Sequence, residues 1–120
     1  MNIGTDIIEV SRIEKLIIEK GDKFLKRIYT DKEIDYCESK GPNKYQHYAG
    51  RFAAKEAITK AIGNRPPSLK NIQITNDDNG APIVDIIPDP VFLGPSLYIS
   101  ISHVKKYAVA FAYIEPLVHN

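Results

Sequence analysis

The chain has 120 residues and a formal net charge of +1, with 43% hydrophobic and 26% charged side chains. These values are typical of a globular protein with one domain over residues 1–120, and the near-neutral charge disfavours a nucleic-acid-binding protein. The single cysteine excludes an internal disulfide, and the lack of a signal peptide or a run of about 20 apolar residues predicts a cytoplasmic protein with no membrane span.

The N-terminal part of the sequence predicts one strand followed by several helices. A capping box, TDKE at 30–33, marks one helix start, and Gly63 marks the end of the longest helix. Together with the spacing of the apolar residues, these signals predict a strand over 2–10, a short helical turn over 24–28, and helices over 12–20, 30–39 and 45–62.

The C-terminal part predicts strands. NDDNG at 76–80 is a turn signal, PDPVFLGPS at 88–96 is a proline-rich loop, and HVKK at 103–106 is a tight link. The alternating segments around them predict strands over 71–75, 82–87, 97–102 and 107–115. This order predicts an α+β domain, with an antiparallel sheet packed against one long helix and short N-terminal helices.

Asp6 is a carboxylate in an otherwise apolar predicted strand. Strand side chains alternate between faces, so Asp6 shares its face with Gly4, Ile8 and Val10. An unpaired carboxylate on an apolar face is costly. Asp6 therefore either reaches water or a helix cap at the strand edge, or binds a cation.

The long predicted helix has an alanine-rich side and a charged side. Its apolar stripe consists of Ala53, Ala54, Ala57, Ile58 and Ala61. The opposite side carries Phe52, Lys55, Glu56, Thr59 and Lys60. Glu56 and Lys60 are four residues apart, so an ordinary ion pair of about 0.2–0.5 kcal/mol on a solvated face explains these charges. That interpretation leaves Phe52 unexplained, and the alanine stripe suits close packing beneath a site.

His103 ends the predicted strand that contains SISH at 100–103. A lone histidine in this position is most often a hydrogen-bonded structural residue. However, Lys105 and Lys106 follow at once, and their ammonium groups would suit a phosphate.

These separate features fit together as a site for a metal ion and a polyphosphate. Asp6 and Glu56 are carboxylates of the kind that hold Mg²⁺ together with water and substrate phosphates. Lys60, His103 and Lys105 are suitable phosphate donors. The sequence has neither zinc-ligand spacing nor a P-loop glycine motif, so a nucleotide would bind in another way.

Several segments resemble the motifs of a known enzyme family. They are GTDIIEVSRI at 4–13, RIYTDKEIDYC at 27–37, AGRFAAKEAITKAIG at 49–63, and SISH at 100–103 followed by YAVAFAYIE. In this order and spacing the chain resembles the holo-[acyl-carrier-protein] synthases, the small bacterial 4′-phosphopantetheinyl transferases. The resemblance runs almost end to end and implies the fold of that family.

The resemblance also implies an activity. Enzymes of this family move 4′-phosphopantetheine from coenzyme A to a serine of apo acyl carrier protein, release 3′,5′-ADP and support fatty acid biosynthesis. They need Mg²⁺, and the matching motifs make Asp6 and Glu56 its ligands. Lys60 would contact the coenzyme A phosphates or assist proton transfer. The general base would be Glu56 or a metal-bound water.

Further residues follow from the same motifs. His103 would hold the nucleotide end of coenzyme A, Arg51 would support the site, and Gly63 would bring backbone amides near phosphate. Arg12 would meet the acidic helix of the carrier protein. The family implies a homotrimer with active sites between protomers.

Two loops depart from the family pattern. Gly63-Asn64-Arg65 replaces a Gly-Thr-Gly-like turn, so an arginine side chain would take the place of glycine amides. Gly80-Ala81-Pro82 replaces Gly-Lys-Pro and loses one cation. Neither change affects the proposed metal ligands.

Two other functions fit parts of the pattern. A Mg²⁺-dependent phosphohydrolase of coenzyme A or a nucleotide would use the same residues but release free phosphopantetheine. A non-catalytic module that binds acyl carrier protein is disfavoured, because two carboxylates would face an acidic partner.

Overall fold

One long helix, α4 (Lys44–Ile62), lies against a three-stranded antiparallel sheet in the computed structural model, which describes residues 2–87 and 96–116. The elements before α4 are β1 (Ile3–Glu9), α1 (Val10–Lys20), α2 (Asp22–Ile28), α3 (Asp31–Glu38) and the 3-10 turn η1 (Gly41–Asn43). After it come the 3-10 turn η2 (Leu69–Asn71), β2 (Ile72–Asn76), β3 (Pro82–Ile86), β4 (Leu97–His103) and β5 (Tyr107–Ile114).

These elements confirm the predicted α+β class. Each predicted strand and helix is present, with ends that differ by at most two residues. The capping box is also confirmed, because the amide of Glu33 donates to Thr30 Oγ1 at 3.3 Å and the amide of Thr30 donates to Glu33 Oε1 at 2.8 Å. The predicted proline-rich loop lies, up to residue 95, outside the described residues.

The strands form two sheets. The larger has the order β1-β5-β4, and β2 pairs with β3 in a separate two-stranded sheet beyond β4. In the larger sheet Asp6 lies opposite Ala110 of β5, and His103 lies opposite Ala108. Asp6 is therefore in the middle of one edge strand, whereas His103 is at the end of the other.

Small residues bring α4 close to the sheet. Ala53, Ala57 and Ala61 on α4 and the alternate alanines of β5 are fully buried or nearly so. At Gly4 the strand lies so close to α4 that a Cβ would collide with the carbonyl oxygen of Ala57 and lie 2.8 Å from the amide nitrogen of Ala61. The predicted alanine stripe is confirmed as the contact face.

One residue of the predicted charged face is in the core. Lys55 is fully buried, so the prediction that it lies on a solvated face is wrong. Its Nζ donates to Glu33 Oε1 at 2.6 Å, to the carbonyl of Ile28 at 2.8 Å and to that of Leu69 at 3.0 Å. All three ammonium protons are used, which makes its burial possible.

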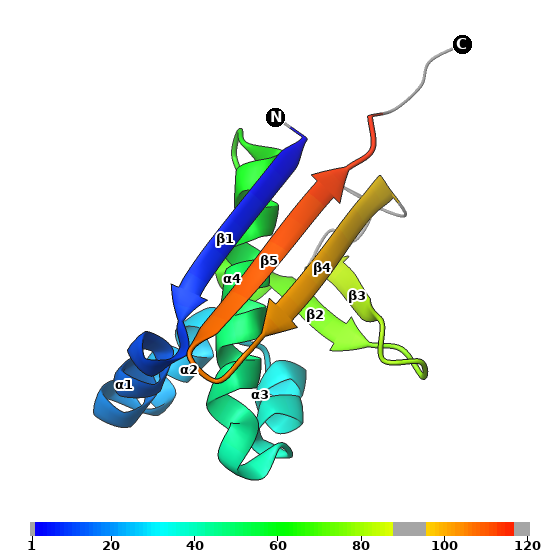
Figure 1. The fold of residues 1–120 in the computed structure, drawn as a ribbon. Coiled ribbons are helices and arrows are strands. Elements are labelled where there is room, and N and C mark those ends of the chain that lie inside the picture. The colour runs from blue at the N-terminus through cyan, green and yellow to red at the C-terminus, as the bar shows by residue number, and fades with distance from the viewer. Residues whose placement is uncertain (1, 88–95, 117–120) are drawn as a thin grey trace.

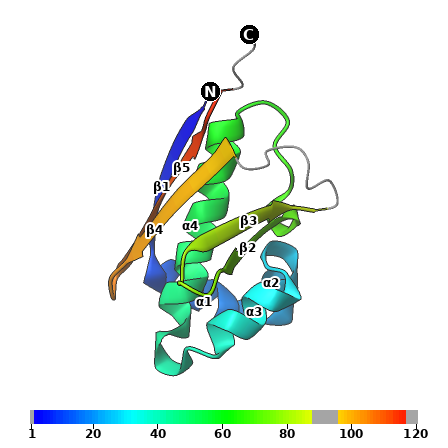
Figure 2. The same ribbon diagram turned by 90° about the vertical axis from the view of Figure 1, so that its right-hand side faces the viewer.

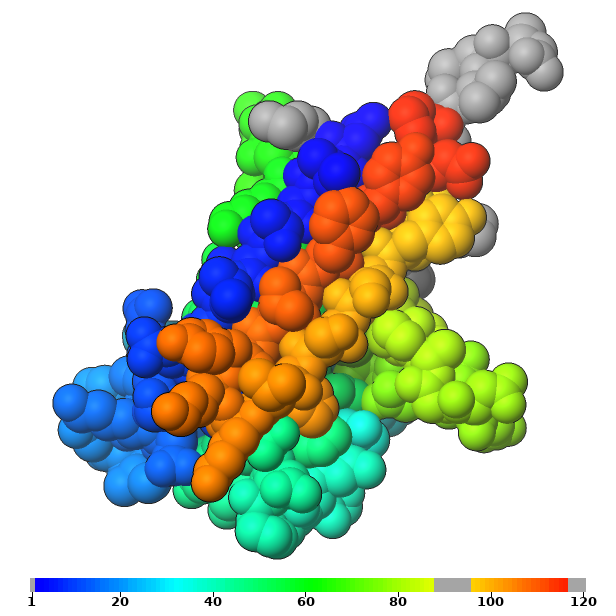
Figure 3. Space-filling model, viewed as in Figure 1, coloured from blue at the N-terminus to red at the C-terminus, as the bar shows by residue number. Residues whose placement is uncertain are grey.

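The outer face of the larger sheet is apolar and exposed. No helix covers it in Figures 1 and 2, and Figure 3 shows side chains of β1, β5 and β4 as parallel ridges across it. Its exposed large residues include Ile3, Ile7, Tyr98, Tyr107, Val109, Phe111 and Tyr113. An ordinary protein surface exposes single, scattered apolar residues. A contiguous apolar patch such as this one indicates an interaction site.

No helix among residues 2–87 and 96–116 is both long and apolar enough to cross a membrane.

Candidate functional site

Asp6 and Lys60 form an ion pair between β1 and α4. Lys60 Nζ lies 3.2 Å from Asp6 Oδ1 and also donates to the carbonyl of Thr5 at 3.0 Å. The Asp6 side chain is 19% exposed, so its charge is partly desolvated and a cation compensates for it. Lys60 thus forms its ion pair with Asp6 on the strand and not with Glu56 on its own helix.

Glu56 belongs to the same cluster. Partial burial raises the pKa of Glu56, and the negative charge of Asp6 raises it further, whereas the cations of Lys60 and Arg12 lower it. These four side chains are therefore close enough to interact electrostatically. The structure brings together both predicted metal ligands, the predicted phosphate contact and the predicted carrier-protein contact.

The chemistry of this cluster fits a hard divalent cation. Asp6 and Glu56 supply carboxylate oxygens, and their mutual repulsion, which adds to the effect of partial burial on the pKa of Glu56, would be relieved by a shared cation. Within the described residues no three His, Cys, Asp or Glu side chains gather around one point. Two carboxylates with substrate phosphates and water form a donor set that Mg²⁺ commonly takes.

A second cluster surrounds His103. Its Nδ1 lies 3.0 Å from Gln46 Oε1, and its ring packs edge-on against that of His47, with 4.8 Å between centroids. Gln46 and His47 both lie in the first turn of α4. About ten residues of helix, or roughly 15 Å, separate them from Glu56, and Lys60 is one turn farther along α4, at roughly 20 Å. Within one chain, His103 is therefore apart from the carboxylates.

Arg51 joins the second cluster. It is 5% exposed, its guanidinium lies 4.0 Å from the centre of the Tyr36 ring, and it donates to Asn76 Oδ1 at 2.5 Å. Arg51, Asn76 and both histidines line a cavity of about 200 Å³. Sequence reasoning missed His47 and Asn76, although His47 is four residues before Arg51 and thus on the same helix face.

His47 is neutral at physiological pH. Burial lowers the pKa of His47 to about 4, and the nearby positive charges of His103, Lys40 and Arg51 act in the same direction. The cavity therefore contains one permanent cation, Arg51, and a pair of imidazoles.

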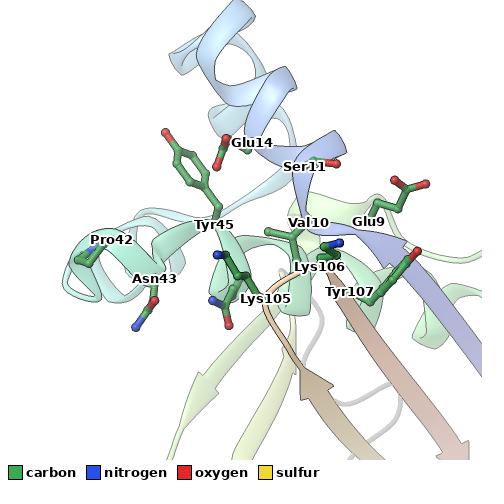
Figure 4. A pocket seen from close by; sticks show the side chains of 11 residues that line it. Glu9, Val10, Ser11, Glu14, Pro42, Asn43, Tyr45, Lys105, Lys106 and Tyr107 are labelled. Carbon is green, nitrogen blue, oxygen red and sulfur yellow. The ribbon is translucent and has the colours of Figure 1, made fainter.

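Lys105 lies outside both the Asp6–Glu56–Lys60 cluster and the His103 cluster. It lines a cavity of about 610 Å³ between the start of α1, the start of α4 and the β4–β5 turn (Figure 4). Figure 4 shows Lys105 and Lys106 on the turn with Tyr45 and Glu14 across from them. The expectation that Lys105 and Lys60 contact one polyphosphate is thus not met within a single chain.

Gly63 ends α4 one turn beyond Lys60. Its φ of 77° is favourable for glycine, and its amide donates to the carbonyl of Thr59 at 3.0 Å. Arg65 also has a positive φ, of 51°. The loop thus keeps a glycine-like backbone at Arg65.

Comparison with known proteins gives consistent matches over most of the chain. The model of the 4′-phosphopantetheinyl transferase superfamily matches residues 2–112. A holo-[acyl-carrier-protein] synthase of Ruminiclostridium cellulolyticum is 43% identical over 122 residues, covering 95% of this chain and 91% of that protein. One of Protochlamydia amoebophila is 45% identical over 117 residues, covering 93% and 95%.

Solved structures agree with the sequence matches. A holo-(acyl-carrier-protein) synthase of Bacillus anthracis in complex with CoA (3′,5′-ADP) has a TM-score of 0.77 at 40% identity, covering 94% of each chain. That of Helicobacter pylori in complex with coenzyme A has a TM-score of 0.82 at 33% identity, covering 94% of this chain and 99% of that one.

Proposed function

This chain belongs to the 4′-phosphopantetheinyl transferase superfamily, and on that premise we propose that it transfers 4′-phosphopantetheine from coenzyme A to a serine of apo acyl carrier protein. The reaction requires Mg²⁺, releases 3′,5′-ADP and supports fatty acid biosynthesis in the cytoplasm. Residues 1–120 act as one catalytic domain. The names of the relatives and the coenzyme A in two of their structures support this proposal.

One observation carries the catalytic assignment. Asp6 on β1 and Glu56 on α4 are close enough for the charge of one to raise the pKa of the other, and Lys60 lies at the same point. A protein that only bound an acidic carrier would gain nothing from two facing carboxylates. A site for a cation and a pyrophosphate accounts for both carboxylates and the lysine.

Each residue then has a role in the transfer. Asp6 and Glu56 would hold Mg²⁺, which would neutralise charge on the pyrophosphate of coenzyme A and favour the departure of 3′,5′-ADP as the other phosphoryl group passes to the serine. Lys60, already 3.2 Å from Asp6, donates to the phosphates. Glu56, whose pKa partial burial raises, is also placed at this point to accept the proton of the attacking serine hydroxyl.

The complete site needs two protomers. Along α4 in one chain, the residues that contact His103 lie roughly 15 Å from Glu56, whereas Arg51 lies between them, roughly 8 Å from Glu56. The exposed apolar face of the larger sheet offers a surface through which copies of the chain associate. In a cyclic homotrimer, His103 and Arg51 of one protomer hold the nucleotide end while Asp6 and Glu56 of its neighbour hold the reacting phosphates.

Two further residues complete the assignment. Arg12 is near Glu56 and on the exposed side of α1, so it is placed to meet an acidic carrier protein close to the reacting phosphate. Gly63, one turn beyond Lys60, lets the backbone of its loop approach the phosphates closely, while its own amide donates to the carbonyl of Thr59.

A mass measurement tests the proposal. The chain is incubated with coenzyme A, Mg²⁺ and apo acyl carrier protein, and the carrier is then weighed by mass spectrometry. Addition of phosphopantetheine to the carrier and release of 3′,5′-ADP are expected. Free phosphopantetheine with an unmodified carrier would instead identify a phosphohydrolase.

A further inference from the structure

Asn76, the last residue of β2, forms side-chain hydrogen bonds to two different parts of the molecule. Its Oδ1 accepts from Arg51 Nη2 at 2.5 Å, and its Nδ2 donates to the carbonyl of Gly80 at 2.9 Å. A guanidinium only donates hydrogen bonds and a carbonyl only accepts them, so these two partners fix the orientation of the Asn76 amide. If the amide were turned over, both hydrogen bonds would be lost. The side chain therefore connects α4 to the turn between β2 and β3.

The Gly80 carbonyl is a firm support, because the turn that carries it is internally hydrogen-bonded. Asp77 Oδ1 accepts from the amides of Asn79 and Ala81, at 2.9 Å each. The amide of Gly80 donates to the carbonyl of Asp77 at 3.0 Å. An aspartate in this role restricts the conformations of a turn. Asn76 is thus anchored at one end on an ordered segment.

At its other end, Asn76 fixes the direction of the Arg51 guanidinium. That group also lies over the Tyr36 ring of α3, with 4.0 Å between its central carbon and the ring centre. Contact with a ring face has little directional preference, whereas a hydrogen bond to one terminal nitrogen sets where the other N–H groups point. Nε of Arg51 is buried and has no hydrogen-bond partner in the described part of the chain. The bond to Asn76 is therefore what orients the guanidinium.

Arg51 and the turn border the same cavity. Its volume is about 200 Å³, and Arg51, Asn76, Gly80 and His103 are among the residues that line it. Arg51 is 5% exposed, so its charge is poorly hydrated and an anion in the cavity would interact with it strongly. The orientation of this one guanidinium therefore matters for an anionic ligand.

A neutral acceptor suits this position better than a carboxylate. A carboxylate would form a charged pair with Arg51 and compensate the positive charge that an anion needs. The amide oxygen of Asn76 orients the guanidinium and leaves its net charge unchanged. A guanidinium has five N–H groups and Asn76 takes up one of them, so others remain for a ligand.

We propose that Asn76 is a positioning residue for the nucleotide end of coenzyme A, because its neutral amide orients the Arg51 guanidinium for a phosphate group without compensating its charge. Asn76 acts through Arg51 and takes no part in the transfer itself. This inference rests on the proposed function in taking coenzyme A and 3′,5′-ADP as the ligands of the cavity.

Binding and kinetics together test this role. Calorimetry gives the Kd of 3′,5′-ADP, and the carrier assay gives kcat and the KM for coenzyme A. In Asn76→Ala the guanidinium must be ordered when the ligand binds, so we expect both the Kd and the KM to rise about threefold to tenfold. We expect kcat to change less than about twofold, because the nucleotide end is held equally in the ground state and the transition state. An unchanged Kd in Asn76→Ala would overturn the proposal, as would failure of the wild-type chain to bind 3′,5′-ADP.

A double variant shows whether Asn76 acts through Arg51. Arg51→Gln alone is expected to weaken 3′,5′-ADP binding by about tenfold or more, because a buried cation is lost. Adding Asn76→Ala to Arg51→Gln should raise the Kd less than about twofold further, since no guanidinium is left to orient. A residue that only stabilised the fold would raise the Kd by the same factor in both backgrounds, and that result would overturn the proposal.

Asn76→Asp separates charge from shape. It keeps an acceptor of nearly the same shape for Arg51, but its negative charge compensates the guanidinium, and it cannot donate to the Gly80 carbonyl. We expect Asn76→Asp to bind 3′,5′-ADP more weakly than Asn76→Ala does. Binding by Asn76→Asp as tight as in wild type would show that a neutral acceptor is not needed and would overturn the proposal.

Asn71→Ala is the matched control. Asn71 is the same type of residue immediately before β2, at the other end of that strand from Asn76, and it is not among the residues that line the cavity. This variant should match wild type in Kd, KM and kcat. Thermal unfolding of each variant sets a temperature at which all of them are folded, and binding is compared at that temperature.

These results are separable from those of the transfer assay. A protein that modifies the carrier but binds 3′,5′-ADP equally well in Asn76→Ala retains the proposed function and loses this inference. A protein whose binding of 3′,5′-ADP depends on Asn76 and Arg51 together, but which leaves the carrier unmodified, retains this inference and loses the transferase.

Discussion

Lys55 and Glu33 form an ion pair in which Nζ lies 2.6 Å from Oε1 and neither side chain has any exposed surface. Burial lowers the pKa of Lys55, and the Glu33 carboxylate opposes that shift. Glu33 also accepts from the amides of Thr30 and Ile74, at 2.8 Å each. The pair thereby joins α4 to the start of α3 and to β2.

Replacing one partner of this pair should be severely destabilising. In Lys55→Met the Glu33 carboxylate stays buried without its cation, which costs about 3–5 kcal/mol. The free energy of unfolding in urea measures this cost. Lys26→Met is the matched control, because Lys26 and Asp31 are 4.0 Å apart and exposed, so its cost should stay below about 1 kcal/mol. Equal costs for the two variants would contradict this account of the core.

Gly4→Ala should separate β1 from α4. The added methyl group meets the backbone of Ala57 and Ala61, which cannot move as a flexible side chain can. We expect a loss of about 3 kcal/mol, the upper part of the range for overpacking. Because β1 carries Asp6, transferase activity should fall as well.

Gly21→Ala is the control for the backbone effect alone. Gly21 has a φ of 55°, but nothing lies within 4 Å of an added Cβ. Its cost should be about 1–2 kcal/mol, from the left-handed conformation only, and activity should be retained. A larger cost at Gly21 than at Gly4 would show that the close approach of β1 is unimportant. Thermal unfolding and the carrier assay measure the two effects.

The sequence predicted the elements well because their signals are local. The capping box at Thr30, the alternation of each strand and the glycine that ends α4 all act within a few residues. The pairing of strands is not local, so nothing in the sequence separated β2 and β3 from the larger sheet. The burial of Lys55 was missed for the same reason, since its partner Glu33 is 22 residues away.

The candidate site was predicted in part. Asp6 and Glu56 were paired by chemistry and by resemblance, and the packing of β1 on α4 does bring them together. The partner of Lys60 could not be predicted, because Glu56 at helical spacing was as suitable as Asp6. Gln46 is four residues before Gly50 and has no chemical signal of its own. Its contact with His103 appears only once β4 places that residue beside it.

Removing either carboxylate without changing its shape should abolish transfer and spare the fold. We expect Asp6→Asn and Glu56→Gln each to lower activity by about 100-fold or more, since the charge that holds the cation is lost. Glu56→Gln should leave stability unchanged or raise it. Its carboxylate has a raised pKa, so its ionised form is disfavoured in the folded state at pH 7.

Two measurements check this assignment. The carrier assay over a range of Mg²⁺ concentrations gives the activity, and thermal unfolding gives the stability. Asp85→Asn on the exposed side of β3 is the matched control and should match wild type in both. Full activity in Asp6→Asn or Glu56→Gln would remove that residue as a metal ligand.

The exposed face of the larger sheet should hold the protomers together. Phe111 is 43% exposed on β5 and lies between Thr5 of β1 and Ser100 of β4. In Phe111→Glu a charge is placed at the centre of this apolar face, and sedimentation should show monomers. Ile18→Glu on α1, at an apolar residue that is 67% exposed and away from the sheet, should sediment as wild type.

Mixing two inactive variants tests whether neighbouring protomers share the site. Asp6→Asn lacks the metal half and keeps the nucleotide half, whereas His103→Ala has the reverse defect. In a 1:1 mixture that is unfolded and refolded together, about a quarter of the sites combine two intact halves if each site spans a heterologous interface. We therefore expect the carrier assay to recover about that fraction of wild-type activity. A mixture no more active than its components would place the whole site within one chain. In that case the roughly 15 Å between the two clusters would have to be spanned by the substrate alone.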